Sequence, residues 1–453
     1  MSESSGRNGA ETTRLRRYLL VAFLALCLVV LAVGISRPQC GPEAADIGDP
    51  GPLPSRGSAG GDSSQAKALA GSLSTFGFDL LLLQAQATSG NVVISPASLA
   101  SVLSMIRNGA LGETERELAQ ALGVENLDPT EVNQGWADLI TAAQSGRKTS
   151  VTVWNSLWLR EDIPFEPAFL DLNREYYAAE CLPLNWNRGA AVDEINRWAS
   201  ERTSGKLPPL FQGLAPEDAL VVVNTVNLKV GWELFHEKDT KLEPFQTDSG
   251  ATVDVEMMHG TLVSAEMEKN VINDREDFDA VCLKTDGPVD VWVVVPKGER
   301  TPEDVVRTLT IEATKPSSTA STAGAGVSAL YFWARSWGDV EVGLPRFEIL
   351  YQPPSLKTDL QAMGIRRLFE GGELHGIADV LPPLYVAGIA HSARIKVDEK
   401  GVEAQAASGA ELGCTGMPAE IRADRPFLVV LAESGSHAPL FLAIVRDPRA
   451  TED

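Results

Sequence analysis

Residues 91–123 read NVVISPASLASVLSMIRNGALGETERELAQALG and carry the start signals of two consecutive helices. Ser95 followed by Pro96 supplies an N-cap and a first-turn proline. The apolar residues after this pair recur at steps of three and four: Leu99, Val102, Leu103 and Ile106. Thr114 and Glu117 have the spacing of a capping box. We therefore expect one helix to begin at Ser95 and a second to begin at Thr114.

The segments on either side of this stretch show helical periodicity first and strand periodicity later. Upstream, apolar residues recur at helical steps: Leu69, Leu73, Phe76, Leu80 and Leu83. Downstream, runs rich in β-branched residues predict strands at 219–230, 289–295, 339–349, 427–431 and 440–445. This order, helices mainly before strands, is typical of the α+β class.

Composition and charge narrow the classes of partner. The 453 residues are 44% hydrophobic and 22% charged, which is ordinary globular usage. A net charge of −22 disfavours nucleic acid as a partner, because affinity for phosphates depends on Lys and Arg. The five cysteines show no CxxC spacing, and no two of the five histidines lie four residues apart. We expect no metal and no cofactor.

The N-terminal region predicts export from the cytoplasm. Residues 19–35 read LLVAFLALCLVVLAVGI, carry no charge and follow a basic stretch, so they fit a transmembrane anchor or the h-region of a signal. Residues 1–18 would then be a basic cytoplasmic tail or a signal n-region, and 36–65 a disordered linker rich in Pro and Gly. The rest of the chain would face outward on an anchor, or be secreted if the signal is cleaved.

Enzyme signatures are missing from the sequence. We find no GxSxG, P-loop, HExxH or Cys-His signature. His391 and Cys414 stand without a placed partner, which is more typical of a core histidine and a free thiol. The sequence does not predict an enzyme.

Eight blocks in consistent order resemble the serpin family. They are residues 91–123, 155–169, 195–211, 221–232, 344–349, 363–369, 397–408 and 424–431. The resemblance covers residues 66–449. It implies one α+β domain in which a helical bundle surrounds three β-sheets, with an exposed reactive-centre loop at about 399–423. It also implies a monomeric inhibitor whose loop is cleaved by a protease and then inserts into the central sheet.

The resemblance assigns roles to particular residues. Ser95, Ser98, Asn224 and His391 would form the hydrogen-bonded shutter where the central sheet parts, and Trp232 would lie near the upper end, the breach. His391 precedes Gly401 by the ten positions expected in the family. The hinge of the loop would be Glu399, Gly401, Val402, Glu403, Ala404, Gln405, Ala406, Ala407 and Ser408.

The loop sequence alternates in a way that does not depend on the resemblance. Every second residue from Val402 is small or apolar: Val402, Ala404, Ala406, Ser408, Ala410 and Leu412. Because side chains alternate across a strand, this segment could bury one face and leave the other in water. An ordinary surface loop of small residues is the alternative interpretation.

The spacing of 26 positions from Gly401 to Phe427 matches the family and implies a scissile bond between Thr415 and Gly416. A shift of one residue, to Cys414, stays open. The partner would be a serine or cysteine protease held as a covalent acyl complex. Because Thr415 is small and β-branched, elastase-like or subtilisin-like targets are favoured. The alternative is a non-inhibitory serpin that acts as a binding or chaperone-like protein.

Overall fold

A computed structural model describes residues 63–449 with the exception of 145–149, 187–189, 204, 206–207, 216–217, 230, 233, 263–271, 286, 315–325, 335–338, 355, 387–388 and 402–418. The segments predicted for residues 1–18 and 19–35, and nearly all of the linker 36–65, lie outside the described residues. The first helix begins at Ser64, close to the predicted start of the domain at 66.

The helices are α2 (Ser64–Ala87), α3 (Pro96–Arg107), α4 (Gly112–Ala121), α5 (Pro129–Gln144), α6 (Pro167–Tyr177), α7 (Ala191–Arg202), α8 (Pro302–Thr314), α9 (Ser328–Trp333) and α10 (Leu356–Ala362), with 3-10 turns η1 (Glu237–Asp239) and η3 (Arg367–Phe369). Ser95 caps α3 as predicted, since its Oγ accepts a hydrogen bond from the Ser98 backbone at 3.2 Å.

The predicted capping box at Thr114 and Glu117 is wrong. Helix α4 begins at Gly112, two residues earlier, without a side-chain cap. The Thr114 hydroxyl instead donates to Glu373 Oε2 at 2.7 Å, and Glu117 accepts backbone bonds from Arg366 and Arg367, each at 2.8 Å. The side chains of Thr114 and Glu117 therefore bond to distant parts of the chain and do not form the capping box.

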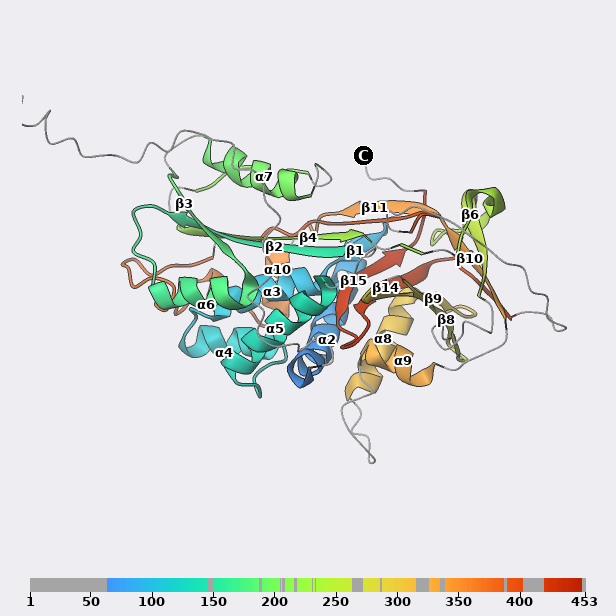
Figure 1. The fold of residues 1–453 in the computed structure, drawn as a ribbon, viewed down its shortest axis with the longest axis horizontal. Coiled ribbons are helices and arrows are strands. Elements are labelled where there is room, and N and C mark those ends of the chain that lie inside the picture. The colour runs from blue at the N-terminus through green and yellow to red at the C-terminus, as the bar shows by residue number, and fades with distance from the viewer. Residues whose placement is uncertain are drawn as a thin grey trace, which may run out of the picture. The chain divides into compact units, whose positions relative to one another are not determined.

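The strands are β1 (Val92–Ile94), β2 (Ser150–Arg160), β3 (Glu180–Leu184), β4 (Leu220–Lys229), β5 (Lys241–Gln246), β6 (Thr252–Leu262), β7 (Ile272–Asp274), β8 (Phe278–Lys284), β9 (Val289–Pro296), β10 (Val340–Pro345), β11 (Phe347–Tyr351), β12 (Ala393–Val397), β13 (Ala419–Arg422), β14 (Phe427–Glu433) and β15 (Pro439–Val445). They form a six-stranded sheet, β1-β15-β14-β9-β8-β7, and a four-stranded sheet, β13-β10-β6-β5. The remaining strands form two ladders, β3-β2-β4 and β11-β12, which lie in one layer (Figure 1).

The run predicted as one strand at 339–349 forms two strands in different sheets. β10 pairs with β6 and β13, whereas β11 pairs with β12. Arg346 lies between them, and its backbone N–H donates to the Glu256 carbonyl at 2.8 Å. Periodicity alone does not reveal such a change of partner, because side-chain alternation continues through it.

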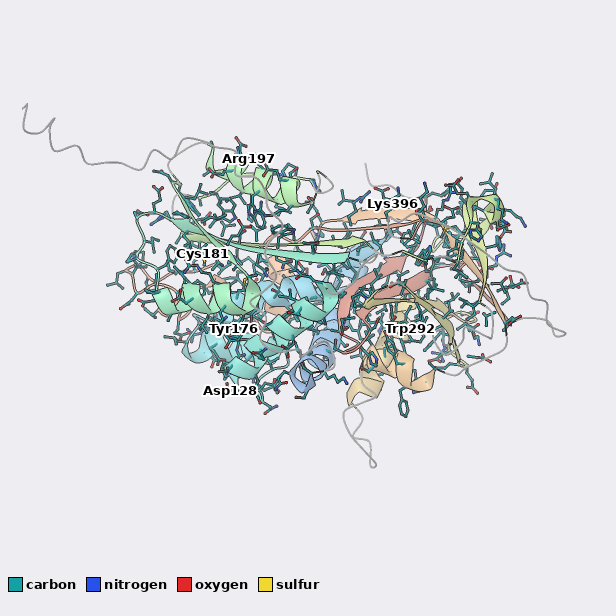
Figure 2. All side chains as sticks on the ribbon, viewed as in Figure 1. Asp128, Tyr176, Cys181, Arg197, Trp292 and Lys396 are labelled. Atoms are coloured by element: carbon teal, nitrogen blue, oxygen red, sulfur yellow. The ribbon has the colours of Figure 1, made fainter. Side chains whose placement is uncertain are left out.

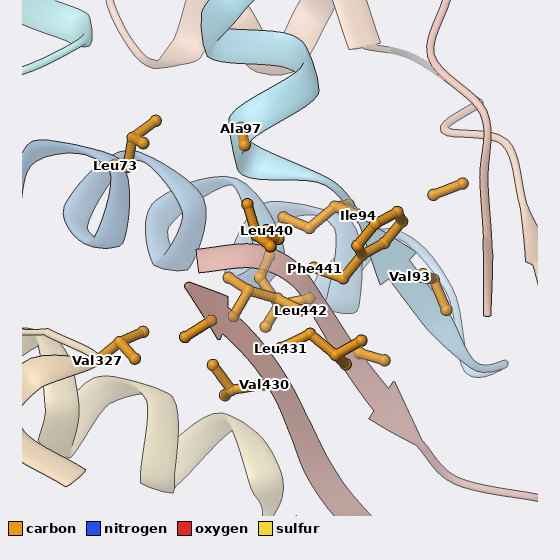
Figure 3. Close-up of a cluster of buried hydrophobic side chains, with 14 of the residues drawn as sticks. Leu73, Val93, Ile94, Ala97, Val327, Val430, Leu431, Leu440, Phe441 and Leu442 are labelled. Atoms are coloured by element: carbon orange, nitrogen blue, oxygen red, sulfur yellow. The ribbon is translucent and has the colours of Figure 1, made fainter. Parts of the chain in front are cut away.

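The main core surrounds the six-stranded sheet. Figure 3 shows side chains from α2, α3, β1, β14 and β15 meeting there, including Leu73, Ile94 and Leu442. Strands β9, β14 and β15 are buried along their whole length, which explains their nearly continuous apolar sequences. On the side of the other sheets, Phe427 contacts Phe245 and Phe347 edge to face, at centroid distances of 6.4 Å and 5.9 Å.

Helix α2 is a core helix by its packing. Among the described residues it alone has the length and apolar composition of a membrane span, and 61% of its apolar window is buried within the protein. It contacts α5, α8 and β15. This helix is distinct from residues 19–35, for which the membrane or signal role stays a prediction.

A second, smaller core lies between α7 and the β3-β2-β4 ladder. Ile195 and Trp198 of α7 pack there with Trp158 and Val221. Helix α7 therefore covers one face of the ladder, while α3 and α5 contact the other face (Figure 1). In Figure 2, Arg197 of α7 and Tyr176 of α6 lie on opposite sides of this ladder.

Candidate functional site

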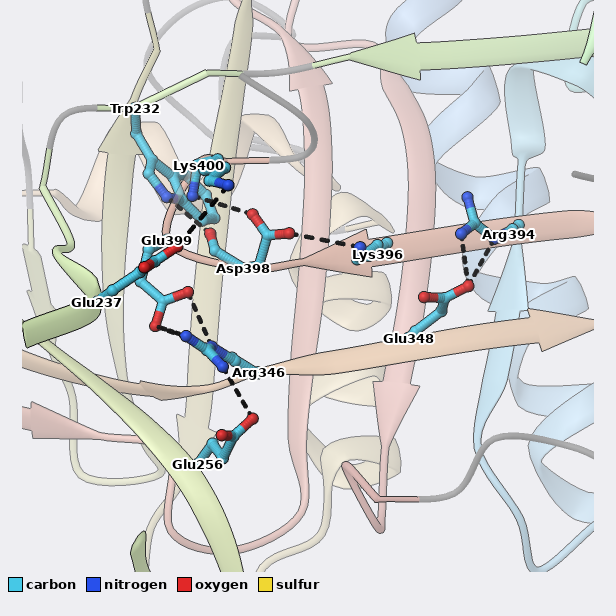
Figure 4. Close-up of polar contacts among 10 residues, drawn as sticks. All are labelled: Trp232, Glu237, Glu256, Arg346, Glu348, Arg394, Lys396, Asp398, Glu399 and Lys400. Carbon is cyan, nitrogen blue, oxygen red and sulfur yellow. Dashed lines mark hydrogen bonds and ion pairs between the residues drawn. The ribbon is translucent and has the colours of Figure 1, made fainter. Parts of the chain in front are cut away.

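The candidate site lies where the two smaller ladders approach each other. One ladder ends on β4 and the other on β12, and within the described residues no ladder pairs these two strands. Just beyond the end of β4, the Trp232 indole N–H donates to the Asp398 carbonyl, just beyond the end of β12, at 3.1 Å. Figure 4 shows this contact, with β4 and β12 running in the same direction. At this end, the two ladders are therefore joined through the side chain of Trp232.

All four residues predicted for the shutter are bonded to one another in pairs at the start of α3. The Ser95 backbone N–H donates to His391 Nε2 at 3.2 Å, and the Ser95 hydroxyl donates to the Leu440 carbonyl at 2.7 Å. One turn further, the Ser98 hydroxyl donates to Asn224 Oδ1 on β4. The N-terminus of α3 is thus bonded to β4 through Asn224 and to the residues preceding β12 through His391.

Burial controls the charge of His391. The side chain is surrounded by protein, and this burial lowers the pKa of the imidazole to about 4, since the charged form would lose its hydration. A neutral ring leaves Nε2 free to accept the Ser95 N–H. The bond from the Ser95 N–H to His391 Nε2 therefore requires the unprotonated histidine.

A set of charged contacts lies at the upper end, near Trp232 (Figure 4). Arg346 contacts Glu399 with an Nη2 to Oε1 distance of 2.5 Å and Glu256 with an Nη1 to Oε2 distance of 3.0 Å. The Thr240 hydroxyl also donates to Glu399. Burial raises the pKa of Glu399, but the bonds from Arg346 and Thr240 outweigh it, so the pKa lies below its usual value. Glu399 is therefore a nearly buried carboxylate that stays ionised.

A cavity of about 350 Å³ opens beside these charges. It is lined by Glu237, Arg346, Phe347, Glu348, Lys396, Val397, Asp398, Glu399 and Lys400. The cavity lies at the end of β12, next to the start of the predicted loop.

The predicted hinge begins at a tight turn. Gly401 has φ +98°, a conformation that favours glycine, and it exchanges two backbone hydrogen bonds with Asp398, at 3.0 Å and 3.2 Å. The other hinge residues, Val402, Glu403, Ala404, Gln405, Ala406, Ala407 and Ser408, and the proposed scissile pair Thr415 and Gly416, lie outside the described residues. Their roles stay predictions.

Sequence reasoning did not assign two residues of the site. Arg346 lies within the LPRFEI block that resembles the serpin family, but nothing local indicates its partner Glu399, 53 positions away. Asn155 is buried on β2 and accepts a bond from the Asn224 amide at 2.7 Å. A polar side chain in a largely apolar strand is a sequence signal that could have indicated a buried hydrogen-bond partner.

The described residues contain no cluster of three or more His, Cys, Asp or Glu side chains able to hold a metal ion. The site consists of two ladders, one ending on β4 and the other on β12, which are joined through α3 at one end and through Trp232 and Asp398 at the other. These features define an α+β protein built around a divided central layer.

Comparison with known proteins places the chain in a family. Residues 71–448 match the family described as Serpin (serine protease inhibitor). Human protein Z-dependent protease inhibitor is 28% identical over 394 residues, covering 84% of this chain and 83% of that protein. Bovine (Bos taurus) serpin A3-3 is 28% identical over 392 residues, covering 84% and 89%.

Solved structures show the same fold. Human thyroxine-binding globulin superposes with a TM-score of 0.72 at 24% identity, covering 85% of this chain and all of that one. The thermophilic serpin tengpin in its native state gives 0.70 at 21% identity, covering 83% and 94%. The chain belongs to the serpin family, which confirms the α+β serpin fold and the prediction that it is not an enzyme.

Proposed function

We propose that this protein inhibits serine proteases as a suicide substrate, inserting its cleaved loop between β4 and β12. The observation that carries the proposal is the ending of one ladder on β4 and of the other on β12, with the strand ends joined through Trp232 and Asp398. A strand inserted between β4 and β12 would find a backbone edge on each side with which to pair. The alternating small residues from Val402 supply the face that such a strand would bury.

Trapping follows from ordinary acyl-transfer chemistry. The target's serine hydroxyl attacks the Thr415 carbonyl, the Gly416 amine leaves with a proton, and an ester to the protease remains. Insertion of the loop then carries the acylated protease away from its docking position. Distortion of the protease's oxyanion hole and triad would stop water from cleaving the ester. Inhibition is therefore a competition between insertion and deacylation.

The residues before the scissile bond suggest the target class. Thr415 suits the small pockets of elastase-like enzymes, and Leu412 could fill a distal apolar pocket of a subtilisin-like enzyme. Thr415 carries no positive charge, so it does not suit the anionic specificity pocket of a trypsin-like protease. We propose elastase-like or subtilisin-like serine proteases as targets, with a cysteine protease as the less favoured class.

Denaturing electrophoresis tests the proposal. The chain is mixed with elastase-like and subtilisin-like proteases at several ratios, and any released C-terminal peptide is identified by mass spectrometry. We expect a covalent band near the summed masses and a peptide that begins at Gly416. Cleavage in the loop without a covalent band, across the panel, would contradict the inhibitor assignment and favour a non-inhibitory serpin that acts as a binding or chaperone-like protein.

We keep a binding protein as the alternative, because thyroxine-binding globulin, which by its name binds thyroxine, has the same fold. Its discriminating result is the one given above, a loop that is cleaved without a covalent band.

We also propose that residues 19–35 place the serpin domain outside the cytoplasm. The support is the uncharged run preceded by arginines. Membrane fractionation of the expressed protein, with N-terminal sequencing of any released form, separates an anchored chain from a secreted one. A full-length chain in the cytoplasmic fraction would contradict both.

A further inference from the structure

A series of buried and partly buried hydrogen bonds leads away from the shutter into the helical half of the protein. Asn224 on β4 donates through Nδ2 to Asn155 Oδ1 on β2 at 2.7 Å. Asn155 in turn donates through Nδ2 to the main-chain carbonyl of Tyr177, the last residue of α6, at 2.7 Å. The ladder is thereby bonded to the end of α6.

The side chain of Tyr177 continues the series into three helices. Its hydroxyl donates to Asn133 Oδ1 on α5 at 2.8 Å. Asn133 donates to Asn108 Oδ1, at the end of α3, at 3.0 Å, and Asn108 donates to Asn173 Oδ1 on α6 at 3.1 Å. Asn173 ends the series by donating to the Phe169 carbonyl at 3.0 Å. We call Asn108, Asn133 and Asn173 the asparagine cluster.

Burial makes this series costly to break. Asn133, Asn155, Asn173 and Tyr177 are at most 4% exposed, so water cannot replace a lost partner. A buried amide left without a partner costs about 1 to 3 kcal/mol. On each side of Tyr177, every amide accepts one bond and donates the next, an arrangement in which bonds strengthen one another; the two halves are joined through the covalent structure of Tyr177. Moving β4 or β2 relative to the helices must break at least one link.

The ring of Tyr177 is held independently of its hydroxyl. It packs against Trp136 of α5 with a centroid distance of 6.3 Å, and the Trp136 indole N–H donates to Ser104 of α3 at 3.0 Å. Removing only the hydroxyl would therefore leave the packing of α3, α5 and α6 in place. This allows the hydrogen-bond series to be tested without a cavity.

We propose that Asn155 holds β2 and β4 against the end of α6 through the Tyr177 carbonyl, and that the Tyr177 hydroxyl and the asparagine cluster fix this end of α6 to α3 and α5. Together these positioning residues resist the parting of the layer at the shutter. The effect on protease trapping rests on the proposed function, but the restraint on β4 does not. The helices α5 and α6 would then influence the shutter.

Amide hydrogen exchange on the intact chain tests this restraint. Tyr177→Phe should speed exchange of the β4 and β2 backbone amides by about two- to fivefold, the change expected from losing part of one hydrogen bond. Exchange in β9, at the centre of the six-stranded sheet, should stay unchanged and reports on global stability. Tyr351→Phe is the matched control for the loss of a buried hydroxyl, because Tyr351 is also buried and its hydroxyl donates to Gln84 Oε1 on α2 at 2.7 Å rather than to the asparagine cluster.

A second measurement asks whether the shutter and the cluster are coupled. Ser98→Ala removes the bond to Asn224, and the double variant with Tyr177→Phe should speed β4 exchange by less than the product of the two single effects. If Tyr177→Phe leaves β4 unchanged, or changes it no more than Tyr351→Phe does, the proposal is wrong. Protease-complex formation is assayed in parallel. Absence of complexes in every variant, with the exchange pattern intact, would contradict the proposed function and leave the restraint established.

Discussion

Glu399 is a nearly buried carboxylate whose charge depends chiefly on one guanidinium, that of Arg346. Arg346→Ala would leave the negative charge with Thr240 as its main remaining donor. Because an unpaired buried charge is costly, we expect the free energy of unfolding to fall by about 2 to 3 kcal/mol, measured by denaturant titration.

The double variant Arg346→Ala with Glu399→Gln tests the reason for that loss. It removes the stranded charge and should recover part of the stability. Equal losses in the single and double variants would indicate that packing of the Arg346 stem, rather than the ion pair, is responsible.

His391 makes the stability of the protein depend on pH. Its pKa is about 4 in the folded protein, compared with an ordinary value of 6.5. Above pH 6.5 both states hold a neutral ring, so the full stability is present. As the pH falls from 6.5 to about 4 the unfolded state binds a proton that the folded state does not, and up to about 3 kcal/mol is lost.

His391→Gln isolates this contribution, since a glutamine keeps an acceptor for the Ser95 N–H but does not titrate. Unfolding free energies measured between pH 7 and pH 4 should fall less steeply in the variant than in the natural chain. Identical slopes would mean that other groups cause the acid sensitivity.

Among the elements, helices and strands with strong periodicity could be predicted from the sequence, whereas their partners could not. The run at 427–431 and the start of α3 appear where expected. The break between β10 and β11 at Arg346 depends on a contact with Glu256, which is distant in sequence. The start of α4 was predicted at the wrong residue because Thr114 bonds to Glu373, which is also distant in sequence.

The asparagine cluster was missed for a similar reason, although a local signal existed. Phe169, Asn173 and Tyr177 lie four residues apart, so Asn173 occupies the buried face of α6 between two aromatic residues. A polar residue in that position indicates a buried partner. That the partner is Asn108 could not be predicted, because the two residues are brought together only when helices α3 and α6 pack.

The predicted loop strand gives a prediction for one element. Ala406→Arg would place a charge on the face that must be buried, so insertion should slow and deacylation should win. We expect the fraction of target trapped as covalent complex to fall by at least about tenfold, with cleaved chain appearing instead. Gln405→Arg, on the face left in water, is the control and should still trap. Equal trapping by both variants would contradict the alternating burial.

At the scale of the whole molecule, the divided layer suggests that the intact chain is not at its most stable arrangement. If the cleaved loop inserts, it completes a ladder with β4 on one side and β12 on the other and buries the small side chains of its alternate positions. The same sequence would then hold more hydrogen bonds and more buried surface after cleavage than before it.

Thermal unfolding of the intact and loop-cleaved chains measures this difference. We expect cleavage to raise the Tm by at least about 10 °C, because a strand paired on both edges adds several kcal/mol to a domain of this size. The cleaved Ala406→Arg variant should show a much smaller rise, which separates insertion from any effect of cutting the chain. A cleaved natural chain that melts at the temperature of the intact one would show that its loop stays outside the layer, and the trapping mechanism would then lack its driving force.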